Sequence, residues 1–304
     1  MARIAAPPEL PGGEDLAAPH TLKYESLAHW HSYAWSNHDI SRIFLSAIPL
    51  RLPMHSWNSM DKEFELALRH HIDAKFRRPP KSDNAILHLI EGSLSRDELR
   101  AYFRGMWESL MVFNRVLLAR LVEQAPTLPI RCELVEIVNP EFGRNLRDAH
   151  PLYFRNFLEA IGVPRRDLSW DFDLDHGPWA EEVQRIRGWT WPQLVGRILC
   201  GEAIGPVTFR AVARACQKHH HLPDYAVAYF TIHSIHDKKD TEILFNLAAR
   251  TITTPAAQAA LLEVVDWSFD RGRYLDYGCR LPDTEPEAYE YTPLFEGRAA
   301  VEVA

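Results

Sequence analysis

Apolar residues recur along most of the chain at intervals of three and four residues, the spacing that places them on one face of an α-helix. No segment alternates convincingly between apolar and polar residues with a period of two, the pattern of a half-buried strand. We therefore predict an all-α protein without a sheet. The predicted helices cover residues 22–46, 59–76, 84–91, 95–124, 129–138, 151–161, 179–187, 191–217, 223–250 and 255–274.

Residues 1–20 are rich in proline and small residues, which predicts a disordered N-terminal tail. Residues 282–304 have a similar composition with several acidic residues, and we expect a C-terminal tail or a segment draped over the domain. A chain of 304 residues is long enough for one sizeable core. We expect residues 21–281 to form a single helical domain.

Charge and composition narrow the choice of partners. A formal net charge of −7 argues against nucleic acid as the main partner, because phosphate binding needs a basic face. No apolar run reaches the roughly 18 residues that span a bilayer, and the first twenty residues lack the apolar centre of a signal peptide. The four cysteines form no CxxC pair, so no zinc knuckle is indicated. We predict a cytoplasmic protein with neither a nucleic-acid nor a membrane partner.

Three ionisable side chains interrupt the apolar face of the helix predicted over residues 223–250. His233, Asp237 and Asp240 follow one another at i, i+4 and i+7. A carboxylate is costly to bury unless it is paired or bound to metal, and imidazole with carboxylate suits iron, manganese or zinc. This helix alone leaves a second interpretation open, a surface stripe with a chance histidine, because two lysines lie beside it.

Further polar residues lie where a core is expected. Glu108 and Glu202 are each surrounded by apolar residues of a predicted helix, and Glu141 and His150 flank a loop before another helix. A single buried glutamate is most often a structural carboxylate paired with an arginine. Several together favour a shared metal site, because helix bundles build di-iron sites from inward-facing carboxylates and histidines.

Taken in order, these residues resemble the haem-oxygenase-like di-iron oxidase and oxygenase superfamily. The segment PEFGRNLRDAHPLYFRNFLEAIG, with Glu141 and His150, is similar to that family's glutamate loop followed by a histidine at a helix start. Glu202 matches the glutamate of the next long helix. His233 and Asp237 match the start of the family's H-x3-D-x2-H motif, in which Asp240 replaces the last histidine.

The resemblance covers residues 84–275 and implies that they form the metal-binding core, a haem-oxygenase-like bundle of about seven helices that holds two Fe(II) ions. Residues 21–80 lie upstream of this core and are expected to form an N-terminal helical extension. Asp240 would raise the number of carboxylate ligands. It would favour a more oxidised or a more labile second iron, or leave that position empty, and His236 is a candidate substitute ligand. The ligand prediction for Glu108 rests mainly on spacing. The implied metal ligands, which are also the catalytic set, are Glu108, Glu141, His150, Glu202, His233, Asp237 and Asp240.

The resemblance also implies an O2-dependent oxidation. We expect C–H cleavage in an amino acid or a molecule derived from one, leading to desaturation, C–C fragmentation or cyclisation in natural-product biosynthesis. N-oxygenation of an amine is one alternative. A metal-free enzyme or a non-catalytic binding protein on the same fold is another.

An amino-acid substrate needs a cation for its carboxylate. Arg144, Arg147 and Arg273 are the candidates, because a guanidinium offers a bidentate fork. An external reductant is a candidate partner for returning the iron to Fe(II). The extension over residues 21–80 is expected either to cover the site or to form a homodimer.

Overall fold

The computed structural model describes residues 59–76, 84–143, 149–171 and 173–271. Within these ranges every regular element is helical and no strand occurs, which confirms the all-α prediction. The predicted helix over residues 22–46 and both predicted tails lie outside the described residues. The single-domain boundaries therefore stay a prediction.

The described elements are all helices or helical turns. In chain order they are α3 (Ser59–Phe76), α4 (Ala85–Glu91), α5 (Arg96–Val112), the π-helix η2 (Phe113–Leu118), α6 (Ala119–Gln124), α7 (Leu128–Phe142), α8 (His150–Ala160), the 3₁₀ turn η3 (Arg165–Asp167), α9 (Ala180–Gly188), α10 (Trp191–His220), α11 (Ala228–Thr251) and α12 (Pro255–Arg271).

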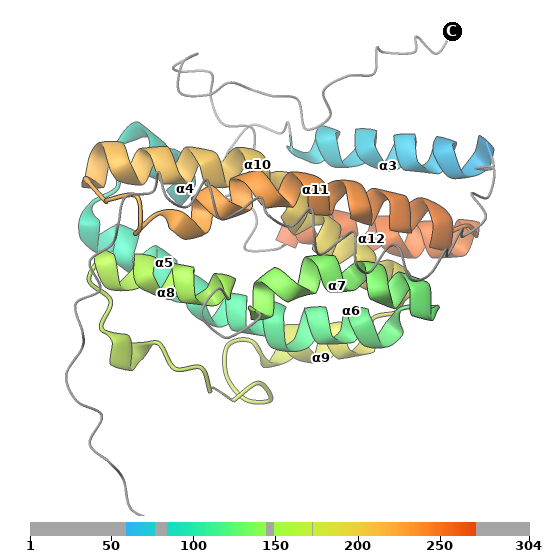
Figure 1. The fold of residues 1–304 in the computed structure, drawn as a ribbon, viewed down its shortest axis with the longest axis horizontal. Coiled ribbons are helices and arrows are strands. Elements are labelled where there is room, and N and C mark those ends of the chain that lie inside the picture. Colours follow the sequence, from blue (N-terminus) through green and yellow to red (C-terminus); the bar gives the residue numbers. More distant parts are fainter. Residues whose placement is uncertain (1–58, 77–83, 144–148, 172, 272–304) are drawn as a thin grey trace, which may run out of the picture. The chain divides into compact units, whose positions relative to one another are not determined.

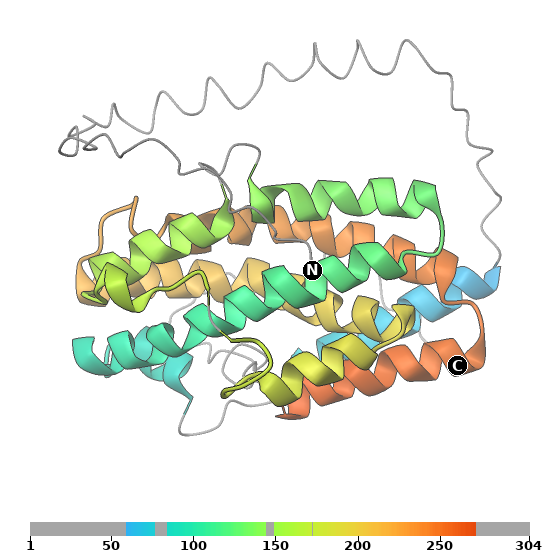
Figure 2. The same cartoon turned by 90° about the horizontal axis from the view of Figure 1, so that it is seen from below.

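The two long helices α10 and α11 run side by side through the middle of the bundle (Figure 1). On one side α12 and α4 pack against α10, and α3 packs against both α11 and α12. On the other side α7 and α8 pack against α11, as the view from below shows (Figure 2). None of the described helices combines the length and the low polarity needed to cross a membrane.

An aromatic cluster joins α5, α8 and α11. The Phe103, Phe157 and Phe230 rings meet edge to face, with centroids 4.9 Å apart for Phe103–Phe157 and 4.8 Å apart for Phe157–Phe230. Trp107 stacks on Phe154 and donates its indole N–H to the Ser169 carbonyl at 2.8 Å. Such pairs add about 0.5–1.5 kcal/mol each beyond their buried area. The cluster therefore fixes α8 and α11 relative to each other.

The end of α7 differs from the sequence prediction. The helix does not stop at residue 138 but continues through Pro140 to Phe142. Proline removes one N–H donor, and in the last turn of a helix the loss is small because few bonds follow it. Gly143 then ends the helix with φ +69°, and a Cβ there would lie 2.6 Å from the Ala149 nitrogen. The extra turn places Glu141 on a helix rather than in a loop.

The predicted continuous α-helix over residues 95–124 is also interrupted. Its start is as expected, with a reciprocal capping box between Ser95 and Glu98. Residues 113–118, however, adopt π-helical bonding. Segments of this kind frequently lie at functional sites, and here the interruption carries the buried Asn114.

Candidate metal centre

Six acidic and histidine side chains meet inside the bundle in two groups of three. In each group, one ligand atom from every residue lies within 4.8 Å of the others. The first group, here called the histidine triad, consists of Glu141, His150 and His233. The second, the carboxylate triad, consists of Glu202, Asp237 and Asp240.

Four helices supply these residues. The end of α7 carries Glu141, and the first residue of α8 is His150. The middle of α10 carries Glu202. The other three residues lie on α11 at the predicted i, i+4 and i+7 spacing, so α11 contributes to both triads.

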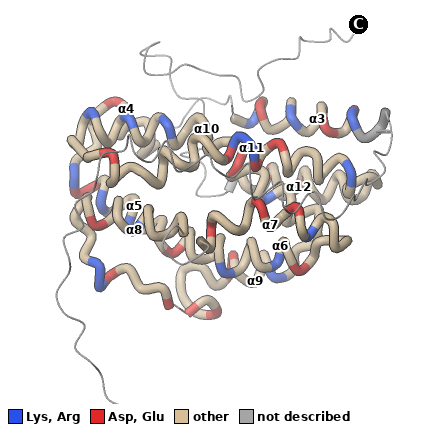
Figure 3. The backbone as a smooth tube through the Cα atoms, in the orientation of Figure 1, with Lys and Arg blue, Asp and Glu red and all other residues tan. Residues whose placement is uncertain are grey.

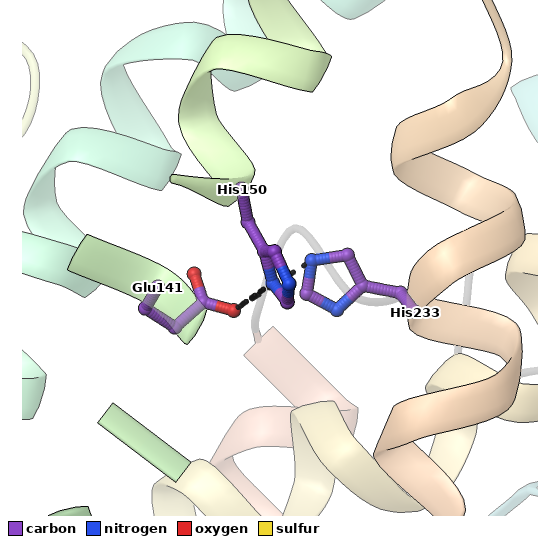
Figure 4. A group of neighbouring side chains, drawn as sticks. All are labelled: Glu141, His150 and His233. Atoms are coloured by element: carbon purple, nitrogen blue, oxygen red, sulfur yellow. Dashed lines mark hydrogen bonds and ion pairs between the residues drawn. The ribbon is translucent and has the colours of Figure 1, made fainter. Parts of the chain in front are cut away.

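The histidine triad is tightly packed and buried (Figure 4). His150 Nδ1 lies 2.6 Å from Glu141 Oε1, and His233 Nε2 lies 3.7 Å from the same oxygen. In the described part of the chain, Glu141 Oε2 and His233 Nε2 are buried without a hydrogen-bond partner. Leaving such an atom unsatisfied costs about 1–3 kcal/mol. A bound cation would satisfy both atoms.

Asp237 connects the two triads. Its Oδ1 lies 2.8 Å from His233 Nδ1, and its carboxyl group also hydrogen-bonds to Glu202. A hydrogen bond from one ring nitrogen to a carboxylate is typical of metal-binding histidines, because it fixes the tautomer and leaves the other nitrogen for the metal. In His233 that other nitrogen is Nε2, which faces Glu141.

A glycine on α10 makes this approach possible. Gly205 lies one turn after Glu202, and a Cβ at that position would be 2.9 Å from Asp237 Cγ. Real Cβ atoms essentially never approach so closely. Only a residue without a side chain allows the Asp237 carboxylate of α11 to lie against the backbone of α10.

The carboxyl groups of the two triads differ in the direction of their pKa shifts. Burial and repulsion from neighbouring carboxylates, Asp240 among them, raise the pKa of Glu202 and of Asp237 well above the ordinary range. Burial raises the pKa of Asp240 to about 6. For Glu141 burial acts in the same direction, but the hydrogen bond and charge of His150 outweigh it and lower the pKa. A divalent cation would displace the protons that the carboxylate triad otherwise retains.

Residues 100–272 of the chain match a family model described as an iron-containing redox enzyme. The chain belongs to this haem-oxygenase-like family. The matched region is more than half of the chain and contains all six residues of the two triads. No curated protein matches the chain.

The donor atoms of this iron-containing redox enzyme fit iron. Carboxylate oxygens and imidazole nitrogens together suit non-haem iron. Burial lowers the pKa of His233, so the imidazole is neutral and able to bind metal. Glu141 Oε2 and His233 Nε2 are buried without a hydrogen-bond partner among the described residues, and His233 Nε2 lies 3.7 Å from Glu141 Oε1. The family assignment and the donor set therefore agree.

Glu108 is not brought together with the other predicted ligands of this family member. Its Oε2 accepts the indole N–H of Trp179 at 3.1 Å, and its Oε1 lies 3.5 Å from Arg104. It belongs to neither triad. The prediction that Glu108 is a metal ligand is therefore unsupported. Its contacts fit the alternative, a structural carboxylate paired with an arginine.

Of the other predicted site residues, the structure describes only His236. His236, the candidate substitute for Asp240, is exposed, and its ring lies 6.3 Å from that of His150. It therefore borders the histidine triad, where no substitute was expected. Arg144, Arg147 and Arg273 lie outside the described residues.

Sequence reasoning missed Asn114. The side chain is 4% exposed, and its Nδ2 donates to the Leu110 carbonyl at 3.2 Å. Its amide also lies close enough to Glu141 to contribute to the lowered pKa of that carboxyl. The available signal was a lone amide in the apolar run LMVFNRVLL, which gives no indication of its partner.

Proposed function

We propose that this iron-containing redox enzyme is a non-haem di-iron oxidase that uses O2 to oxidise an amino acid or a molecule derived from one. The observation that carries the proposal is the pair of adjoining triads on α7, α8, α10 and α11. Four carboxylates are present, and their combined charge when ionised balances two divalent cations. A single cation would leave a buried excess of negative charge, which is costly.

The protein side chains hold and shield this centre. Iron, when bound, would supply the electrons that activate O2. His233 stays in the metal-binding tautomer through its bond to Asp237. The rings of Tyr229 and Phe209 pack on His233 at 4.4 and 5.4 Å between centroids and exclude bulk water on that side.

An amino-acid substrate is favoured by the sequence around the histidine triad. Arg144 and Arg147 come between Glu141 and His150 in the sequence, and a guanidinium offers a bidentate fork for a substrate carboxylate. Binding of the carboxylate would present a nearby C–H bond for cleavage. Desaturation, C–C fragmentation or cyclisation would follow from that first step.

The first test is metal loading. We expect the full chain, loaded with Fe(II) without oxygen, to retain about two iron ions and to change its optical absorbance on mixing with O2. His233→Ala should abolish the absorbance change while the helical circular dichroism persists, and the exposed His176→Ala is the matched control. Near-zero iron, or no response to O2 in the wild type, would contradict the proposal.

The second test separates the reaction types. The iron-loaded protein is incubated with a panel of amino acids and O2, and the products are followed by mass spectrometry. Loss of hydrogen or release of a fragment supports C–H cleavage. A product that has gained one oxygen atom on its amine nitrogen would show N-oxygenation instead.

A further inference from the structure

The two triads offer unlike donor atoms. The histidine triad has two imidazoles and one carboxylate, whereas the carboxylate triad has three carboxylates and no nitrogen. We propose that the carboxylate triad is a hard, all-oxygen metal position that accepts Mn(II) about as readily as Fe(II), while the histidine triad selects iron. This inference rests on the proposed function, because it assumes that both triads bind a metal ion.

Donor chemistry sets the direction of this difference. Across first-row metals, a site binds Fe(II) more tightly than Mn(II). Imidazole nitrogen suits iron, whereas carboxylate oxygen also suits the harder Mn(II) ion. A position without nitrogen therefore loses the donor that discriminates most strongly between the two metals. The metal that enters it then depends mainly on supply.

The surrounding imidazoles are directed to the other triad. His150 Nδ1 is bonded to Glu141, and His233 Nδ1 is bonded to Asp237, which leaves His233 Nε2 facing Glu141. His236 lies beside His150. Among the described residues, no histidine is grouped with the carboxylate triad.

Burial means that the three carboxylates can ionise together only with a cation at this position. Glu202 and Asp237 are only 7% and 3% exposed, and they repel each other and Asp240. Ionising all three together without a cation would bury uncompensated charge. The adjoining triad also contains buried polar atoms, Glu141 Oε2 and His233 Nε2, that have no hydrogen-bond partner among the described residues.

Asp240 is the residue that decides the selectivity. It is the third α11 residue of the centre, and it stands where the resembled motif has a histidine. Asp240→His would add one nitrogen donor to the carboxylate triad. It would thereby restore discrimination in favour of iron.

The experiment is a metal competition on the full-length chain. Metal-free protein is mixed without oxygen with equal Fe(II) and Mn(II) in the presence of excess Mg(II), desalted, and analysed for metal content. With equal supply and similar affinity at the carboxylate triad, we expect about one and a half irons and about half a manganese per wild-type chain, with an electron paramagnetic resonance signal of protein-bound Mn(II). In Asp240→His the manganese-to-iron ratio should fall about tenfold, equivalent to about 1.4 kcal/mol in relative affinity.

Asp97→His serves as the control, because Asp97 is an exposed residue of α5 outside both triads. It should keep the wild-type ratio. Two irons and almost no manganese in the wild type would overturn the inference and leave the di-iron proposal intact. Replacement of manganese by magnesium, or equal ratios in wild type and Asp240→His, would also overturn it. A single metal ion per chain would overturn both proposals.

Discussion

At the scale of single residues, Asp237 makes the two triads depend on each other. It orients His233 through one oxygen and hydrogen-bonds to Glu202, and it lies against Gly205. A carboxylate shared in this way transmits any displacement of α10 relative to α11 to both metal positions. The glycine that admits it is therefore as important to the centre as a ligand.

Gly205→Ala tests this dependence. The added methyl group would push the Asp237 carboxylate away, so we expect iron content to fall at both positions while helical circular dichroism remains. Gly105→Ala is the matched control, since a Cβ at that helical glycine meets nothing within 4 Å. Metal analysis after loading with Fe(II) gives the result. If Gly205→Ala keeps the wild-type iron content, displacement of the Asp237 carboxylate does not affect metal binding, which would contradict the prediction.

The same residue scale shows what the sequence could predict. The spacing of His233, Asp237 and Asp240 predicts that they share one helical face. It does not show that they are buried, nor that His233 belongs to a different triad from the two aspartates. Gly205 could not be found in this way, since its role depends on the distance between two helices. Glu108 and Glu202 have similar apolar neighbours in sequence, and only the fold shows that Glu108 meets Trp179.

At the scale of elements, the irregular parts of the helices carry the centre. The last turn of α7 follows Pro140 and carries Glu141, and the π-helix η2 carries Asn114, which contacts that glutamate. A regular helix was the correct prediction for most of these segments. The π-bonding could not be predicted, because a single widened turn changes the apolar spacing too little to be recognised.

Asn114→Leu tests the role of η2. Asn114 does not belong to either triad, so we infer that it positions Glu141. Its loss should weaken iron binding by about tenfold, as is common for residues that orient a ligand. The pH dependence of iron binding should shift as well, because Asn114 helps to lower the pKa of Glu141. Equilibrium dialysis against Fe(II) at several pH values measures both effects.

Asn246→Leu is the control for that variant. The Asn246 side chain donates to the carbonyl four residues earlier on α11, just as Asn114 donates to Leu110 on α5. A general effect of removing such a bond would therefore appear in both variants. An unchanged iron affinity and pH profile in Asn114→Leu would show that the contact with Glu141 does not position it.

At the scale of the whole molecule, local pattern and long-range placement contributed differently. Helical periodicity alone predicted the all-α fold and most helix boundaries, including Ser59–Phe76. It could not bring Glu141 of α7 next to His233 of α11, because packing between distant helices leaves little trace in one sequence. That placement followed from the resemblance, and the family match over residues 100–272 supports the resemblance.

The stability of the metal-free protein should depend on pH through the carboxylate triad. The pKa values of Glu202 and Asp237 lie well above the ordinary range, and that of Asp240 is raised to about 6. A carboxyl group with a raised folded-state pKa stabilises the fold while it is protonated. This contribution is complete below its unfolded-state pKa and is lost as the pH rises through its folded-state pKa.

We therefore expect the melting temperature of the metal-free protein to fall between about pH 5 and pH 7. Bound metal replaces the protons, so the gain in melting temperature on adding Fe(II) should widen over the same interval. Asp240→Asn should flatten the metal-free profile. Asp266→Asn is the control, because hydrogen bonds from Lys75 and His71 outweigh burial and lower the pKa of Asp266, so its contribution changes only at lower pH. If the increase in melting temperature on adding Fe(II) stays constant across this pH interval, the three carboxylates are not the groups that the metal deprotonates.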